Sequence, residues 1–283
     1  MRLWLRRLLR DKDERPSTGQ AFFCFALILS LTWFSMSLGQ GMLIAQAIRY
    51  LAFVATPALG MALILTTQPR ESLALRWPPL WSLGVALLLA LLLLPPLAQI
   101  TLWILQQFPV IYEYAKETQS PLDWSSSPWV SLLVFAWLPA FCEEVTFRGF
   151  ILTGLQRRFR PRTAVVISSF LFALFHLNVF QLLPTFFLGL VLAYLTTRCG
   201  SILPSILFHL LYNTLILVPA LFPDALGESS LEQALQSQSM LWLPALISSP
   251  IALWLLWRLT KRAPHPAYVD YLRSDPSLRK DVD

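Results

Sequence analysis

Two adjacent glutamates, Glu143 and Glu144, stand in a stretch of sequence that is otherwise free of acidic residues. They are the only acids between residues 131 and 222, and two of the three histidines of the chain, His176 and His209, lie in the same stretch. An ionisable side chain near the middle of a bilayer costs roughly 2.5–3.5 kcal/mol on insertion scales, so it persists mainly where a function or a partner compensates for it. We therefore interpret these four side chains as candidate functional residues.

Helical spacing predicts different partners for the two glutamates. Glu144 and Arg148 are four residues apart, which places them on one helix face and predicts an ion pair within the helix. Glu143 is turned about 100° away around the helix axis and can therefore contact a different partner. His209 and Asn213 are also four residues apart, so an imidazole and an amide lie side by side.

The candidate residues fall at similar depths in a bilayer. Measured from the nearest arginines at the inner ends of their helices, at 1.5 Å per residue, the depths are about 21, 24, 16 and 22 Å for Glu143, His176, His209 and Asn213. Such agreement between three helices indicates one shared site.

These residue types are sufficient for hydrolysis. A carboxylate flanked by apolar groups can accept a proton from water and later return it to a leaving amine, and Glu143 is the candidate for this base. Glu144, neutralised by Arg148, would stabilise the position of the helix and set the electrostatic potential at the site. Imidazole and amide groups can also stabilise an oxyanion, at roughly 3–4 kcal/mol per donor; the candidates here are His176, His209 and Asn213.

A divalent metal such as zinc is an open alternative. Two histidines and a carboxylate form a familiar catalytic zinc shell with a water at the fourth position. The ligands would then be Glu143, His176 and His209. We expect no cofactor, but the sequence does not separate the two mechanisms.

The composition is that of a membrane protein. Of the 283 residues 56% are hydrophobic and 13% are charged, against roughly 25% charged in a soluble domain. The apolar residues come in blocks near the ~20 residues that cross a bilayer as a helix. We predict an all-α polytopic membrane protein with about eight transmembrane helices, at about residues 21–38, 51–67, 79–105, 129–156, 163–179, 181–197, 201–221 and 240–257.

The placement of charge sets the expected orientation. With the N-terminus inside, 19 of the 22 Lys and Arg residues fall in cytoplasmic segments, as the positive-inside rule requires. This predicts cytoplasmic N- and C-termini. It also accounts for the net charge of +6 without a nucleic-acid partner. We expect a multi-pass integral protein of a bacterial cytoplasmic (inner) membrane.

The chain divides by composition into five parts. These are a basic cytoplasmic or interfacial lead at 1–20, a transmembrane scaffold with an outer loop at 21–128, a catalytic transmembrane core at 129–221, an outer loop with the last transmembrane helix at 222–258, and a cytoplasmic tail at 259–283.

Three motifs in the core resemble those of a known family. Glu143 to Arg148 fits EExxxR, Phe172 to His176 fits FxxxH, and His209 to Asn213 fits HxxxN. In this order they resemble the CPBP family of intramembrane proteases, also called Abi or type II CAAX prenyl endopeptidases. The resemblance covers roughly residues 130–220. It implies an all-helical intramembrane endopeptidase in which Glu143 activates water, Glu144 and Arg148 are structural or electrostatic, and His176, His209 and Asn213 line the site. It favours a glutamic over a metal-dependent mechanism.

The expected partners are a membrane-associated peptide or protein substrate and the lipid bilayer itself. The substrate, any need for prenylation and the oligomeric state are not fixed by the sequence. Two other functions compete with proteolysis. One is a catalytically idle peptide-binding or immunity protein that uses the same cavity. The other is a proton-coupled transporter, in which intramembrane Glu and His form a relay.

Overall fold

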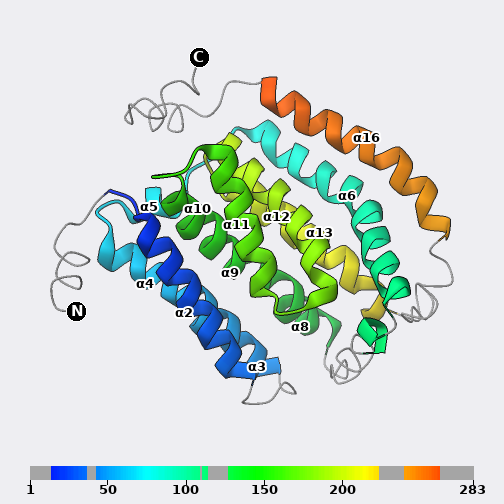
Figure 1. Ribbon diagram of the computed structural model, residues 1–283, viewed down its shortest axis with the longest axis horizontal. Helices are drawn as coiled ribbons and strands as arrows, with labels where there is room; N and C mark the ends of the chain where they lie inside the picture. The colour runs from blue at the N-terminus through cyan, green and yellow to red at the C-terminus, as the bar shows by residue number, and fades with distance from the viewer. Residues whose placement is uncertain (1–13, 37–42, 109, 114–126, 223–238, 262–283) are drawn as a thin grey trace.

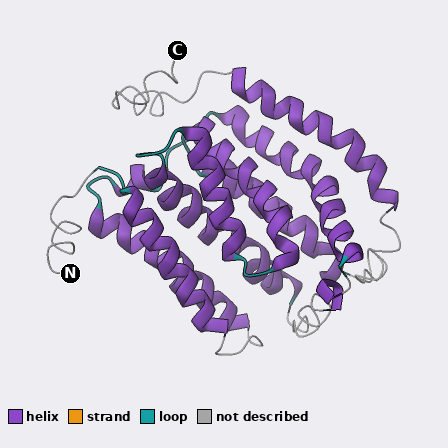
Figure 2. Ribbon diagram, in the orientation of Figure 1, coloured by secondary structure: helices purple, strands orange, loops and turns teal. Residues whose placement is uncertain are grey.

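The described part of the chain consists of helices joined by short loops. A computed structural model describes residues 14–36, 43–108, 110–113, 127–222 and 239–261, and these ranges contain no β-sheet (Figure 2). The α-helices are α2 (Thr18–Met36), α3 (Leu43–Ile48), α4 (Thr56–Leu65), α5 (Pro69–Ser72), α6 (Leu80–Gln107), α8 (Pro128–Leu132), α9 (Leu138–Glu144), α10 (Leu152–Leu155), α11 (Pro161–Phe175), α12 (Val179–Cys199), α13 (Leu203–Leu221) and α16 (Ser239–Lys261). Three π-helical segments continue them, η1 (Arg49–Ala55), η2 (Leu133–Trp137) and η3 (Val145–Ile151).

Each of the eight predicted apolar blocks coincides with a helical segment. Six segments are long and apolar enough to cross a membrane, namely Thr18–Ser35, Leu43–Leu65, Leu80–Gln107, Pro128–Leu155, Val179–Cys199 and Trp242–Leu259. Two shorter apolar helices, Pro161–Phe175 and Leu203–Pro219, account for the other two blocks. The all-α polytopic membrane fold is therefore confirmed. Eight crossings, the cytoplasmic termini and the five-part division stay predictions. Most of the basic lead and of the tail, residues 1–13 and 262–283, lies outside the described residues.

The span that carries both glutamates lies in the middle of the molecule. Helices α8 to α10 form one continuous span. In its most apolar 18-residue stretch 67% of the residues are buried by protein, against 28% in the corresponding stretch of α6 and 22% in that of α16. In Figure 1 α16 forms one outer edge of the molecule and lies beside α6. Helices α2 and α4 lie toward the opposite edge, and α9 to α11 lie between the two edges. The outer helices expose large apolar side chains such as Trp254 and Trp257. An apolar surface of this kind suits contact with lipid.

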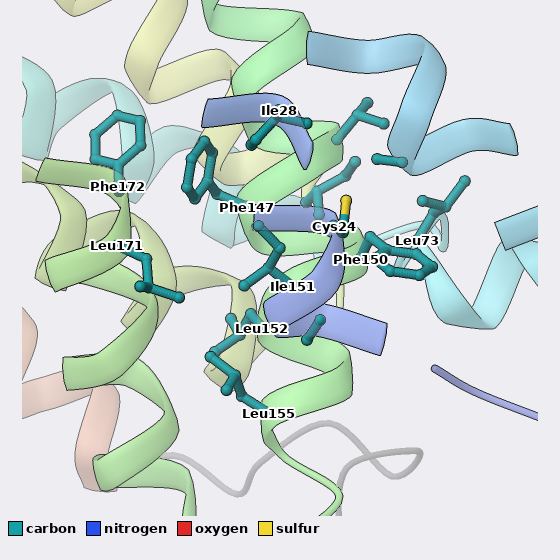
Figure 3. Close-up of a cluster of buried hydrophobic side chains, with 14 of the residues drawn as sticks. Cys24, Ile28, Leu73, Phe147, Phe150, Ile151, Leu152, Leu155, Leu171 and Phe172 are labelled. Atoms are coloured by element: carbon teal, nitrogen blue, oxygen red, sulfur yellow. The ribbon is translucent and has the colours of Figure 1, made fainter. Parts of the chain in front are cut away.

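Two clusters of buried apolar side chains hold the helices together. The first joins η3 and α10 to α2, η1, α4 and α11, with Phe147 and Ile151 packed among Ile28, Cys24 and Phe172 (Figure 3). The second joins α6, α12, α13 and α16, and the buried side chains at its centre are Leu89, Leu192, Phe208 and Ala252.

Glycines let neighbouring helices approach closely. A Cβ on Gly154 would lie 2.9 Å from the Cβ of Ala21 and 3.0 Å from the carbonyl oxygen of Ser17. At this crossing the hydroxyl of Thr18 donates a hydrogen bond of 2.9 Å to the carbonyl of Gly154. Between membrane helices, such small residues bring backbones into van der Waals contact. Helix α2 therefore docks directly on the span that carries the glutamates.

We expect Gly154→Ala to destabilise the protein by about 1–3 kcal/mol, because the new methyl group meets backbone that cannot move cheaply. Unfolding in mixed detergent micelles, followed by circular dichroism, measures the change. The control is Gly60→Ala in α4, where an added Cβ meets nothing within 4 Å. That variant should gain about 0.5–1 kcal/mol from helix propensity. Equal effects of the two substitutions would contradict close packing at Gly154.

Candidate active site

Glu143 and Glu144 are the last two residues of α9, and π-helix η3 begins immediately after them. A second π-helix, η2, precedes α9, so the acidic pair lies between two segments with widened backbone turns. π-Helical segments occur frequently at functional sites. The side chain of Glu144 is fully buried, and that of Glu143 is 5% exposed. Both carboxyl groups are therefore held inside the protein.

Glu144 joins two helical elements through one oxygen. Its Oε1 accepts a hydrogen bond of 2.9 Å from Nη1 of Arg148, which is the ion pair that the spacing predicted. The same oxygen lies 2.9 Å from Nδ1 of His209 on α13. All three side chains are buried. A buried ion pair is costly to desolvate, and the third partner offsets part of that cost with a charge-assisted hydrogen bond.

Arg148 contacts two further helices. Its guanidinium carbon lies 4.0 Å above the centre of the Phe172 ring of α11. Its Nη2 lies 3.5 Å from the carbonyl oxygen of Gly189 on α12, at the long limit of a hydrogen bond. A cation over an aromatic face is attracted by the ring quadrupole, by about 2 kcal/mol where both groups are desolvated. The arginine thereby ties α11 and α12 to the acidic pair.

The bond to Glu144 fixes the tautomer of His209. A carboxylate only accepts hydrogen bonds, so Nδ1 carries the proton, and in the neutral ring Nε2 carries the lone pair. This Nε2 lies 3.9 Å from Oε2 of Glu143. The separation is too long for a direct hydrogen bond but suits a single bridging water. Glu143 makes no hydrogen bond within the described residues. This agrees with the expectation that Glu144, and not Glu143, pairs with Arg148.

His176 occupies the C-cap of α11 rather than the Glu144 network. Its Nδ1 donates a hydrogen bond of 2.9 Å to the carbonyl of Phe172, and the two rings lie 4.8 Å apart. The following residue, Leu177, has a φ of 50°, a left-handed conformation that costs a non-glycine residue of order 1–3 kcal/mol. Within the part of the chain described, no hydrogen bond or ion pair joins His176 to Glu143.

Asn213 fixes the helix that carries His209. Its Nδ2 lies 3.3 Å from the carbonyl oxygen of Ala136 in η2. One residue on, the hydroxyl of Thr214 accepts a hydrogen bond of 3.0 Å from Nε1 of Trp137. Both bonds link α13 to the turn before α9, so they set the position of the imidazole relative to the glutamates. The second hydrogen of the Asn213 amide has no partner in the described ranges.

The possible metal ligands do not converge in this arrangement. Among the described residues no group of three or more His, Cys, Asp or Glu side chains is placed to hold a metal ion. His209 and His176 each use Nδ1 in a hydrogen bond, to Glu144 and to the carbonyl of Phe172, which leaves Nε2 as the atom that could bind a metal. The grouping of Glu143, His176 and His209 that a zinc shell needs is not present among the described residues.

Some of the contacts that support the site come from residues that the sequence did not single out. These are the carbonyl groups of Gly189 and Ala136 and the bond of 3.0 Å from the Thr146 hydroxyl to the carbonyl of Val54 in η1. Backbone carbonyls carry no sequence signal. Gly189 is the partial exception, because a glycine in an apolar helix often marks a close crossing. Here a Cβ would meet Ser169 at 3.1 Å.

The fold and the site together define a class. The protein is an all-helical membrane protein with a buried Glu–Arg–His network and a second glutamate beside it. Residues 125–215 match the model of the family described as Type II CAAX prenyl endopeptidase Rce1-like, and all three motifs lie inside this segment. The match confirms the family resemblance and indicates a membrane endopeptidase. The comparisons with curated proteins and with solved structures find no match.

We expect Glu144→Gln to destabilise the fold by about 3 kcal/mol, because it leaves the buried Arg148 cation without its counter-ion. Glu143→Gln is the matched control, with the same isosteric change one residue earlier. Since Glu143 makes no hydrogen bond in the described residues and only faces His209 at 3.9 Å, its substitution should change stability by less than about 1 kcal/mol. Thermal unfolding in detergent compares the two variants. Equal losses of stability would contradict the division of roles.

Proposed function

We propose that this protein is an intramembrane endopeptidase that hydrolyses peptide bonds of a membrane-associated peptide or protein. The observation that carries the proposal is the pair of acceptors, Glu143 Oε2 and His209 Nε2, separated by 3.9 Å. A water between them donates one hydrogen bond to each acceptor. Its lone pair then points outward, toward the carbonyl carbon of a bound substrate.

Glu143 acts as general base and then as general acid. It takes a proton from the water as the oxygen attacks the carbonyl carbon, and the carbonyl becomes a tetrahedral oxyanion. Glu143 next delivers this proton to the amide nitrogen, the C–N bond breaks, and an acid and an amine leave. Proton transfer by a positioned carboxylate contributes about 10²–10⁴-fold to the rate.

Glu144 and Arg148 are positioning residues in this scheme. Glu144 holds the proton of His209 at Nδ1, so Nε2 stays an acceptor that orients the water. Arg148 supplies the counter-charge of Glu144, with Nη1 2.9 Å from Oε1. The arrangement follows the general logic of hydrolases, in which a carboxylate fixes the tautomer and orientation of a histidine.

The oxyanion would be stabilised by the free amide hydrogen of Asn213 and, as an imidazolium, by His176. Asn213 is only partly buried and has one hydrogen to spare after its bond to Ala136. His176 is also partly buried, but because its Nδ1–H binds the carbonyl of Phe172, its Nε2 donates only when the ring carries both protons. Losing one such donor in other hydrolases costs about 10²–10³-fold in rate.

Glu143→Gln should abolish cleavage, with a loss of about 10²–10⁴-fold in kcat, while the protein stays folded. Because the substrate is unidentified, the measurement is quantitative proteomics of membrane peptides in cells carrying the variant or the wild-type protein. Candidate peptides are then incubated with both purified proteins in liposomes. Glu14→Gln, an exposed carboxylate, is the control and should cleave at the wild-type rate.

Two results would overturn the proposal. Cleavage that persists in Glu143→Gln would remove the general base. A wild-type protein that binds a peptide but cleaves none would instead favour the idle binding protein, and proton-dependent uptake into vesicles would favour the transporter.

Chelation tests the choice between a glutamic and a metal-dependent reaction. Since Glu143, His176 and His209 do not converge, we expect cleavage to survive exhaustive treatment with EDTA and 1,10-phenanthroline. Elemental measurement of the active protein should find no stoichiometric metal. Loss of activity that is restored by added Zn²⁺, but not by Ca²⁺, would contradict the glutamic mechanism.

A further inference from the structure

A small cavity is lined in part by Arg148, together with Arg15 and Arg76. It leaves about 40 Å³ for the centres of water molecules, which is room for about three waters. Four parts of the chain line it. These are the segment before α2, helix α5 with the loop that follows it, η3 together with α10, and the end of α12 with Gly200. These are mostly helix ends, so the cavity lies at one end of the helical bundle.

The lining is rich in arginine. The guanidinium groups of Arg15, Arg76 and Arg148 line the cavity together with the carboxylate of Glu71, and Arg148 is also paired with Glu144. Arg76 pairs with Glu71 through Nε, at 2.8 Å, and through Nη2, and Arg15 lies 3.9 Å from the same carboxylate. The remaining lining includes amide and hydroxyl groups such as those of Gln156 and Thr197, which are bonded to each other at 3.0 Å.

Arg15 and Arg76 lie close enough to affect each other. Arg76 lies in the loop before α6, outside the membrane spans, and burial together with the neighbouring Arg15 cation lowers the pKa of its guanidinium from the ordinary value. An anion placed between the two cations would reduce their mutual repulsion.

Arg148 supplies an independent sign of a ligand. It is fully buried, it lines the cavity, and its Nε has no hydrogen-bond partner among the described residues. Its Nη1 is already bound to Glu144. A buried N–H donor without a partner costs about 1–3 kcal/mol, more for a charged group, unless a water or an anion satisfies it.

We propose that this cavity binds the phosphate group of an anionic ligand, held by Arg15 and Arg76 and reaching toward Nε of Arg148. Guanidinium groups bind phosphate oxygens through paired, charge-assisted hydrogen bonds. The site lies at the end of the spans that carries the arginine clusters, where lipid phosphates lie in a bilayer. Either an anionic lipid headgroup or a soluble phosphate fits this chemistry. The inference is independent of the proposed peptidase activity.

The test is titration of the full-length protein with inorganic phosphate, in nanodiscs of phosphatidylcholine, by isothermal calorimetry. Arg15→Gln and Arg76→Gln should each raise the Kd about tenfold or more, because each removes a charge-assisted hydrogen bond. Glu71→Gln should lower the Kd, because it removes the carboxylate that competes with the ligand. Arg70→Gln removes an exposed arginine of the same short helix that does not line the cavity, so it should bind like the wild type.

Nanodiscs of phosphatidylglycerol separate the two sources. If the anionic lipid prevents phosphate binding to the wild-type protein, the ligand is a lipid headgroup. If phosphate binds equally well in both lipids, the ligand is a soluble phosphate. The site would be refuted if the folded wild-type protein showed neither saturable phosphate binding in phosphatidylcholine nor tightly retained phosphatidylglycerol. Equal affinity of the wild-type, Arg15→Gln and Arg76→Gln proteins would also refute it.

Discussion

The carboxylate of Glu144 is the point on which the site depends. It is fully buried, and one of its oxygens accepts hydrogen bonds from Arg148 on its own span and from His209 on α13. Through the arginine the same network reaches the ring of Phe172 on α11 and the backbone of Gly189 on α12. In a low-dielectric interior an unpaired charge is costly, so each partner makes the others necessary. The requirement to satisfy one buried carboxylate thus links four helical elements.

This constraint separates structural from chemical roles in the acidic pair. Glu144 binds two donors through Oε1, and its Oε2 is buried with no hydrogen-bond partner among the described residues. Glu143, one residue earlier, faces Nε2 of His209 across 3.9 Å and makes no hydrogen bond within the described ranges. A group that acts as general base has to keep its lone pairs available for water. The π-helical segments η2 and η3 lie on either side of α9, so widened backbone turns flank the helix that ends in this pair.

Arg148 also connects the buried site to the cavity that Arg15 and Arg76 line. Arg148 binds Glu144 through Nη1 and lines the cavity beside Arg15 and Arg76. A guanidinium has five N–H donors in a fixed plane, so it can serve a carboxylate and a second anion at once. The outer helices α6 and α16 take no part in this network in the described residues and expose apolar side chains at the surface instead. The polar chemistry is concentrated in the central span and its neighbours.

The sequence by itself determined the features that arise within a single helix. The apolar blocks predicted the helices, because crossing a bilayer requires about 20 apolar residues. The spacing of Glu144 and Arg148 predicted their ion pair, because residues four apart share a helix face. The tertiary structure decided the rest. His209 is 65 residues from Glu144, and whether its ring meets Glu144 or Glu143 depends on how two helices are rotated and tilted against each other. Likewise, the bonds to the carbonyls of Gly189 and Ala136 depend on packing distances that residue types do not encode, because every residue has the same carbonyl group.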